Sequence, residues 1–416
     1  MANNQTTPAR LWNRDFLLLW QGVAESKLGS VLYAIGIGVW VYDRTDSAAL
    51  MGLMTSFSYF GALVLQPLGG VLADRADRCR KRTLIAGSDL VCGVVMLALG
   101  ALAWQGRMQV WQVLAVAAVS AVCASVLQPA VNSLLPQVTP PGELMRGMSL
   151  INGTLNALQM LGNAAGGFFV AFFGVPALIV FNGLTFLFSS CTEWFIRAGR
   201  TPAAGAQENG APGAFWGELI GGVRYLRSQP GVARIVLAGA AVNLTCAGFT
   251  GIVYVWCLEK GMTVPQYGLF LSAESAAMLA GLAVLAVRPI PARRRWGVLA
   301  AAVTVQSVLY IAAMAVHGFW ACTLLYAANA FFNAISNSFM FPAVAAATDP
   351  AYHGRILSLL TALCGGGVAL SMLAYGALAD VFGAAAVSFG GALLTVLPYA
   401  VFTLDPDMRR LLARET

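Results

Sequence analysis

Long runs of apolar residues alternate with short polar segments along almost the whole 416-residue chain. An apolar run of roughly 20 residues can cross the ~30 Å hydrocarbon core of a bilayer as a helix. By that criterion the sequence predicts spanning helices at residues 16–42, 48–73, 83–104, 110–136, 147–172, 176–197, 233–258, 266–287, 296–316, 320–346, 355–381 and 384–404. The pattern therefore predicts an all-α membrane protein with twelve transmembrane helices.

The longest polar interval separates the sixth predicted helix from the seventh. It opens with a run of small residues and prolines at 201–213, which is typical of a flexible linker. Apolar residues at helical spacing in 215–227 predict an amphipathic helix on the membrane surface. We therefore expect a cytoplasmic N-terminus at 1–15, a six-helix bundle at 16–197, a linker at 198–232, a second six-helix bundle at 233–404 and a cytoplasmic tail at 405–416.

The composition supports an integral membrane protein. Hydrophobic residues make up 58% of the chain and charged residues only 10%, which is too little polar surface to cover a soluble globule. The net charge of +7 reflects topology rather than nucleic-acid binding. With both termini inside, nearly all lysines and arginines lie on the cytoplasmic side, whereas Arg44, Arg107 and Lys260 lie outside and Lys27 lies within a helix.

The sequence lacks the residue patterns that several classes of chemistry require. The eight cysteines are scattered without a close pair, and the two histidines lie at segment ends, so we expect no disulfide framework, no metal site and no cofactor. No glycine-rich loop ends in Gly-Lys-Ser/Thr, so this chain encodes no ATP-driven pump. No nucleophile with a histidine base can be assembled, and we do not expect an enzyme.

One stretch between the second and third apolar runs stands apart, GGVLADRADRCRKR at 69–82. Its five cations and two carboxylates cannot lie in hydrocarbon, so it predicts a tight loop at one membrane face. The alternative is an ordinary loop whose charge only sets orientation. A glycine, three residues, Asp-Arg and then a basic run resembles the loop between helices 2 and 3 of the major facilitator superfamily of secondary transporters. Asp77 and Cys79 depart from that family's pattern.

This resemblance carries expectations about residues and function. It implies that Gly70 lets helix 2 approach a neighbour, and that Asp74, Arg75 and Arg78 belong to a charge network that closes a cytoplasmic gate. Asp at position 74 resembles the branch that contains macrolide-efflux and enterobactin-export proteins. That branch implies export of a small hydrophobic or amphipathic organic molecule, with protons as the coupling ion, by a monomer in the bacterial cytoplasmic (inner) membrane.

The two halves of the chain also repeat each other. Pro-Ala-Val, a prolyl turn, an arginine and a glycine follow in the same order from 129–174 and from 342–383. Two like-oriented six-helix repeats are the parallel halves of the major facilitator fold, which binds substrate near the midplane between them. The glycine-rich run at 162–167 resembles the antiporter signature of drug exporters, with Asn163 in place of its proline.

Charged residues inside the predicted helices are candidates for proton coupling, because an ionisable group in hydrocarbon usually faces a cavity. Glu25 and Lys27 lie ~15 Å into the first helix and project about 200° apart, so each needs another partner. That partner is substrate, water or a neighbouring helix. Glu274 is the second candidate carboxylate. Asp89 is a third, although its position favours pairing with the basic loop, and Glu193 and Asp380 are expected at the interfaces.

Polar and aromatic side chains on the predicted helices are candidates for a substrate cavity. Three asparagines form a stripe of four-residue steps on the tenth helix, either for substrate contact or for hydrogen bonds between helices. A similar stripe at 152–163 on the fifth helix is expected to pack between the halves. The candidates for the cavity are Gln21, Lys27, Tyr33, Asn243, Tyr254, Asn329, Asn333 and Asn337.

The sequence thus predicts a secondary transporter that alternates between inward-open and outward-open states. The fourth predicted helix carries no arginine, although many proton-coupled exporters place one there, so coupling falls on Glu25 or Glu274. A lipid or lysolipid flippase, or a uniporter of the same fold, is the alternative. A receptor that does not transport would need a signalling domain, which neither tail is long enough to hold.

Overall fold

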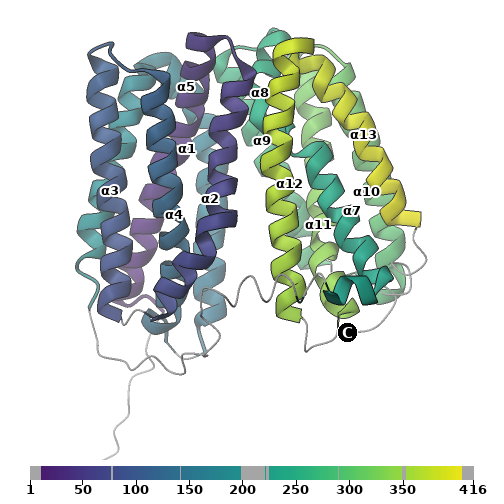
Figure 1. The fold of residues 1–416 in the computed structure, drawn as a ribbon, viewed down its shortest axis with the longest axis horizontal. Coiled ribbons are helices and arrows are strands. Elements are labelled where there is room, and N and C mark those ends of the chain that lie inside the picture. Colours follow the sequence, from purple (N-terminus) through teal and green to yellow (C-terminus); the bar gives the residue numbers. More distant parts are fainter. Residues whose placement is uncertain are drawn as a thin grey trace, which may run out of the picture.

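The computed structural model describes residues 11–75, 78–140, 142–197, 221, 224–288, 290–348 and 353–404. Every regular element among these residues is a helix (Figure 1). The helices are α1 (Arg14–Thr45), α2 (Ala48–Arg75), α3 (Arg78–Trp104), α4 (Val110–Val138), α5 (Leu144–Glu193), α7 (Pro230–Cys246), α8 (Phe249–Glu259), α9 (Val264–Val287), α10 (Ala292–Ala315), α11 (Phe319–Ala347), α12 (His353–Phe382) and α13 (Ala384–Leu404).

These helices follow the predicted spans closely. α5 contains two of them, since Gly174 interrupts it with φ 74° and ψ 167°, a backbone conformation that favours glycine, and Pro176 follows. The seventh predicted span is divided between α7 and α8. Among the described residues, eight helices are long and apolar enough to cross a membrane, and the 50-residue α5 is one of them.

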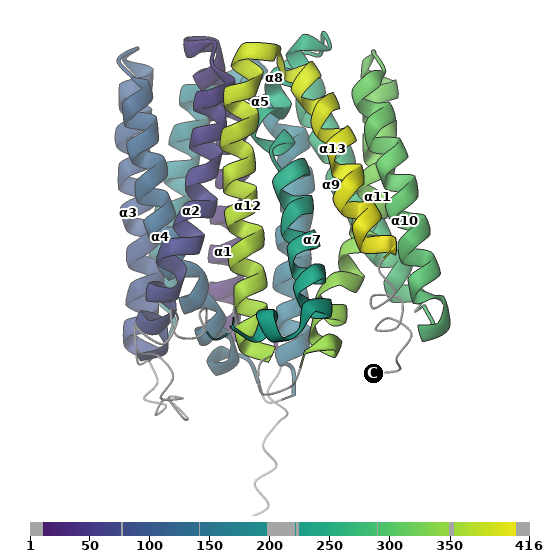
Figure 2. The ribbon, with the colours of Figure 1, turned by 45° about the vertical axis from the view of Figure 1, so that its right-hand side comes forward.

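The helices form two groups that lie side by side, α1 to α5 on the left of Figure 1 and α7 to α13 on the right. We call these groups the N-half and the C-half. α1 packs along α5 in the N-half, and α7 packs on α12 and α13 in the C-half. We call the end of the molecule at which α3 and α12 begin the terminal end, and the opposite end the distal end (Figure 2).

The most extensive contacts between the halves are made by two helix pairs, α2 with α12 and α5 with α9, and α8 also contacts α2 and α1. Glycines allow the backbones to approach at both seams. A Cβ atom on Gly52 would overlap the carbonyl oxygen of Met372, and one on Gly268 would lie 2.6 Å from that of Asn163. Contacts this close leave no room for a side chain. Glycine at these positions therefore allows the two halves to pack closely in the distal part of the molecule.

The side chains of the predicted cytoplasmic gate lie outside the part of the chain that the structure describes. Gly70, Asp74 and Arg75 belong to the last turns of α2, and Arg78 begins α3, but their side chains lie outside the described residues. Asp77, in the same loop, lies outside them as well. The role of this loop as a gate therefore stays a prediction.

The predicted linker also falls mostly outside the described residues, which resume continuously at Arg224. Residues 224–228 are helical, as the amphipathic pattern predicts for this end of the segment. The boundaries of the linker and of the terminal tails stay predictions.

Candidate substrate and proton sites

A cavity of about 580 Å³ lies within the N-half, and we call it the N-half cavity. Its walls come from α1, α3, α4 and both parts of α5. Its lining combines hydroxyl, amide and apolar side chains with one charged group, the ammonium of Lys27. The lining residues are Val23, Ser26, Lys27, Ser30, Cys92, Ser120, Ala121, Cys123, Ala124, Leu127, Gln128, Leu155, Asn156, Gln159 and Phe186.

A chain of hydrogen bonds leads from this cavity to the C-half. Lys27 Nζ donates to Gln159 Oε1 at 2.6 Å, and Gln159 Nε2 donates to Asn163 Oδ1 at 2.9 Å. Asn163 Nδ2 then crosses the α5–α9 seam and donates to Ser275 Oγ at 3.3 Å and to the carbonyl of Leu271 at 3.5 Å. The prediction that the polar stripe of the fifth helix packs between the halves is confirmed at Asn163, whereas Asn156 and Gln159 of the same stripe line the N-half cavity.

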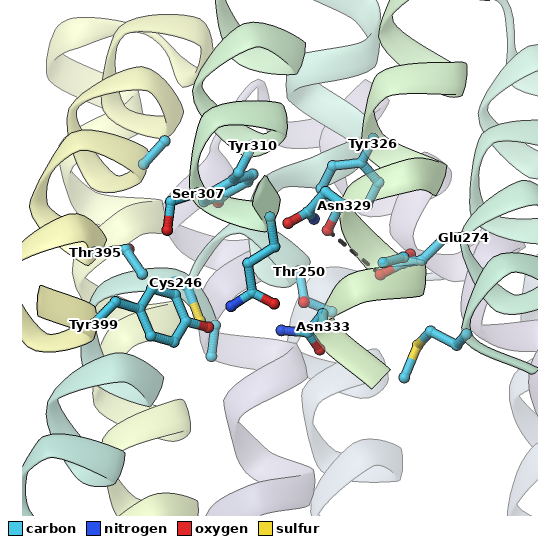
Figure 3. A pocket seen from close by; sticks show the side chains of 15 residues that line it. Cys246, Thr250, Glu274, Ser307, Tyr310, Tyr326, Asn329, Asn333, Thr395 and Tyr399 are labelled. Carbon is cyan, nitrogen blue, oxygen red and sulfur yellow. Dashed lines mark hydrogen bonds between the residues drawn. The ribbon is translucent and has the colours of Figure 1, made fainter. Parts of the chain in front are cut away.

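A second cavity, of about 160 Å³, lies within the C-half (Figure 3). We call it the C-half cavity. Glu274 of α9 reaches it from one side, and the hydroxyl of Tyr326 on α11 donates to Glu274 Oε1 at 3.4 Å. Asn329 and Asn333 of the predicted stripe lie on the same wall, and Tyr399 of α13 points in from the other side.

A neighbouring cavity of about 140 Å³ shares Asn333 and Tyr399 with the C-half cavity. Asn243 of α7 and Asn337 of α11 line it, and Asn337 Nδ2 donates to Asn333 Oδ1 at 2.8 Å. The structure therefore brings Asn243 and all three asparagines of the stripe together with Glu274. Each of the three cavities is lined from one half, although the family resemblance led us to expect a substrate site between the halves.

The carboxylates of the N-half lie elsewhere. Glu25 lines none of these cavities. Its Oε1 atom accepts from Gln21 Nε2 at 3.0 Å, and its Oε2 atom is buried without a partner among the described residues. Gln21 is likewise outside the three cavities, as is Tyr33, which packs against the central apolar core.

Asp89 does not pair with the basic loop, and that expectation was wrong. Ser189 Oγ of α5 donates to Asp89 Oδ2 at 2.6 Å, because this face of α3 turns inward to α5. Glu193 was expected at the interface but is only 1% exposed, as is Asp89. The absent side chain of Gly22 makes room for Glu193, whose Oε1 atom would lie 2.5 Å from a Cβ atom there.

Two other predicted positions make contacts between the halves at the distal end, and we call these contacts the distal seam. Tyr254 was expected in the substrate cavity but lies outside all three cavities; it is buried, and its hydroxyl donates to Asp43 Oδ1 of α1 at 3.3 Å. Asp380 lies at the exposed end of α12, as predicted. Its carboxylate also accepts a hydrogen bond from the backbone amide of Ala48 at the start of α2.

Sequence reasoning missed Gln306 and Tyr399 as lining residues. Gln306 is an amide in the middle of an apolar helix, which is a recognisable signal because such a group needs a polar partner in hydrocarbon. Tyr399 gave no such signal, since aromatic residues at helical spacing commonly serve as packing. Among the described residues, no three His, Cys, Asp or Glu side chains are grouped to hold a metal ion.

Known proteins of similar sequence include bacterial transporters. Macrolide efflux protein A of Streptococcus pyogenes is 23% identical over 228 residues, which cover 55% of this chain and 55% of that protein. An uncharacterised transporter of Bacillus subtilis, YfiS, is 26% identical over 144 residues, which cover 35% of this chain and 32% of that protein. The chain thus spans about half the length, or less, of these curated relatives.

Solved structures of similar fold cover nearly the whole chain. A mutant form of the nucleoside transporter NupG superposes with a TM-score of 0.74 at 12% identity, over 94% of this chain and all of that one. A bacterial homologue of the human lysosomal transporter Spinster, in an inward-facing and unoccupied conformation, gives 0.71 at 13% identity, over 97% and 98% of the two chains.

The family itself follows from a direct match of sequence. Residues 28–294 match the model of the Major Facilitator Superfamily. The predictions of an all-helical membrane transporter fold and of a protein that is not an enzyme are thereby confirmed. With the helical architecture described above, this match shows that the chain belongs to the Major Facilitator Superfamily of multi-pass membrane transporters, which move small molecules.

Proposed function

We propose that this transporter exports a small hydrophobic or amphipathic organic molecule in exchange for protons, by alternating access. The relatives named macrolide efflux protein A support export of such a molecule. The N-half cavity supports it too, because an organic substrate needs both apolar wall and a few polar groups that fix its orientation.

The observation that carries the proton coupling is the position of Glu274. Its carboxyl group lines the C-half cavity, and the hydroxyl of Tyr326 is the hydrogen-bond donor that it meets there. Within the described part of the chain, no lysine or arginine lies within ion-pairing distance of it. A carboxyl group in this setting gains and loses a proton without breaking an ion pair, whereas Glu25 lines none of the three cavities.

Glu274 also lies beside the link between the halves. Ser275 follows it on α9 and accepts the hydrogen bond from Asn163 that ends the chain from Lys27. Proton binding at Glu274 and substrate binding beside Lys27 therefore act on the same seam. This arrangement supports exchange, in which one event changes the free energy of the other.

We further propose that the distal end faces outward across a bacterial inner membrane and that both termini are cytoplasmic. The predicted excess of cations at the terminal end supports this orientation. The contacts between the halves at Gly52 and Gly268 then lie on the outer side, which corresponds to a state closed to the outside. We expect the protein to work as a monomer.

The test uses purified protein in liposomes with an imposed pH gradient. Lumenal pH is followed with a trapped dye while macrolides, siderophores and other amphipathic compounds are added one at a time. We expect proton movement that depends on one compound and disappears in Glu274→Gln. Glu25→Gln separates the two candidate carboxylates, and Glu143→Gln, at a partly exposed carboxylate beside Arg146, is the matched control.

Two results would contradict the proposal. If both Glu274→Gln and Glu25→Gln kept transport that depends on pH, the proton site would lie elsewhere. If a compound moved at the same rate without a gradient and without proton flux, the protein would be a uniporter or a flippase.

A further inference from the structure

We propose that the N-half cavity binds an amphipathic organic anion, whose acidic group pairs with Lys27. This inference rests on the proposed function, because it names the chemical class of the molecule that is exported. Three observations support it. Lys27 has no counter-ion among the described residues, one of its three N–H donors has an assigned partner, and much of the surrounding wall is apolar.

Among the residues whose side chains are described, Lys27 is the one charged residue that lines the cavity. Its ammonium has three N–H donors, and the structure assigns one of them, to Gln159 Oε1 at 2.6 Å. Among the described residues, no carboxylate lies within ion-pairing distance of Lys27 Nζ. The described side chains therefore supply an amide oxygen but no counter-charge to an ammonium held inside the bundle.

Two carboxylates on helices that line the cavity, α1 and α3, are engaged elsewhere. Glu25 projects from another face of α1, where it accepts from Gln21. Asp89 accepts from Ser189 in the α3–α5 contact. A charge within hydrocarbon is costly unless it is paired, so an anionic ligand that reaches Lys27 gains a charge-assisted hydrogen bond that the protein does not already make.

The rest of the cavity wall indicates the chemistry of the remainder of the ligand. The apolar part is formed by Val23, Leu127, Leu155 and Phe186 together with alanines of α4. The volume of about 580 Å³ lies in the range of pockets that hold drug-sized molecules, roughly 300–1,000 Å³. An acidic head with a compact apolar body matches both parts of this wall.

The charge of Lys27 also disfavours the binding of cationic and neutral ligands. A cationic amphiphile would place its charge near an ammonium that no carboxylate of the lining neutralises, and a neutral one would bury that ammonium unpaired. The amides of Gln128 and Asn156 serve any polar group equally well, so they do not reverse this preference.

The experiment measures binding, without a gradient, to purified protein in nanodiscs of zwitterionic lipid. Three probes share one fluorescent body: dansylglycine, which is an anion, its neutral amide, and dansyl ethylenediamine, which is a cation. Fluorescence anisotropy gives their dissociation constants. We expect dansylglycine to bind at least about tenfold more tightly than the amide, as a charge-assisted hydrogen bond implies.

Three variants assign that difference to Lys27. Lys27→Met should remove the advantage of the anion, Lys27→Arg should restore most of it, and Arg146→Gln should leave it unchanged, since Arg146 lies on the surface beside Glu143. If lysophosphatidylglycerol competes with dansylglycine, the natural ligand is an anionic lysolipid. If it does not compete, the natural ligand is a soluble organic acid. Both outcomes keep Lys27 as the anion site.

Equal binding of the three probes, or an advantage of the anion that survives Lys27→Met in a variant that still elutes as a folded monomer, would overturn the inference. These failures are distinct from failure of the proposed function. Binding of the anion that depends on Lys27, without movement of that anion in liposomes, would keep the site and reject the transport proposal.

Discussion

Asp380 at the distal end of α12 accepts a hydrogen bond from the backbone amide of Ala48, the first residue of α2, over 2.5 Å. The same carboxylate accepts from Ser47 Oγ at 2.7 Å. Asp380 thus caps the first turn of a helix that belongs to the other half of the protein. This cap exists only while the distal ends of α2 and α12 are together.

Replacing Asp380 by alanine should favour separation of the distal ends. A lost helix cap costs about 1 kcal/mol, which corresponds to roughly a fivefold change in a two-state equilibrium. Spin labels at Gln105 and His317, both exposed at the distal end in different halves, would report it as a larger population of long distances. The labels require a background from which the native cysteines have been removed.

Glu259 provides the matched control for this variant. Its two carboxylate oxygens accept from the amides of Ala384 and Ala385 at 2.7 and 2.6 Å, so it caps α13 from α8 within the C-half. Glu259→Ala should lower thermal stability without changing the distance between the labels. An equal shift of the label distances in both variants would mean that loss of either cap loosens the whole bundle. Asp380 would then not specifically hold the distal ends of α2 and α12 together.

Gly376→Ala should disturb the same seam by steric means. A Cβ atom there would lie 2.7 Å from the carbonyl oxygen of Ala48, and backbone atoms cannot turn aside as a flexible side chain can. We expect slower transport and a distal end that closes incompletely. Gly365→Ala on the same helix meets nothing within 4 Å and should leave transport unchanged, so a comparable loss in both variants would point to helix rigidity instead.

The spans could be predicted from the sequence because each must be an apolar run of a fixed minimum length. Even the division of α5 was visible, since the predicted spans 147–172 and 176–197 leave a gap at Gly174, where the backbone turns. Glu274 and Lys27 were recognisable for a related reason, because a charge within an apolar run stands out. Their depth follows from their place in the run.

The neighbours of these residues could not be predicted, since they depend on how each helix is rotated about its axis. Glu193 is buried because Gly22, far away in the sequence, leaves space for it. Tyr254 faces Asp43 across the distal seam rather than a cavity, and no local pattern around either residue signals that contact. The hydrogen bonds from Lys27 to Ser275 similarly join residues of three helices.

The hydrogen bond across the α5–α9 seam should be measurable as a coupling free energy. Asn163→Ala, Ser275→Ala and the double variant form a cycle, and a bond between membrane helices averages about 0.6 kcal/mol. Unfolding in SDS would provide the four free energies of unfolding, for the unmodified protein and the three variants. A coupling near zero would mean that Asn163 is held by the carbonyl of Leu271 alone, and that the chain from Lys27 ends there.

The last prediction concerns Asp89, which is buried in contact with Ser189 and close to the buried Glu193. Its Oδ1 atom has no partner among the described residues, and neither has Oε2 of Glu193. Because no cation pairs with Asp89 there, Asp89→Asn should keep the thermal midpoint or raise it: the amide oxygen still accepts from Ser189 and carries no charge.

Asp89→Ala should lower the free energy of unfolding by about 1–3 kcal/mol, since it leaves the Ser189 hydroxyl without its acceptor and opens a space beside α5. Thermal unfolding followed by tryptophan fluorescence separates the two variants, and Glu143→Gln on the surface should match the unmodified protein. Equal losses for asparagine and alanine would contradict this account, because they would show that the site requires the charge of Asp89 and therefore a cation bound to it.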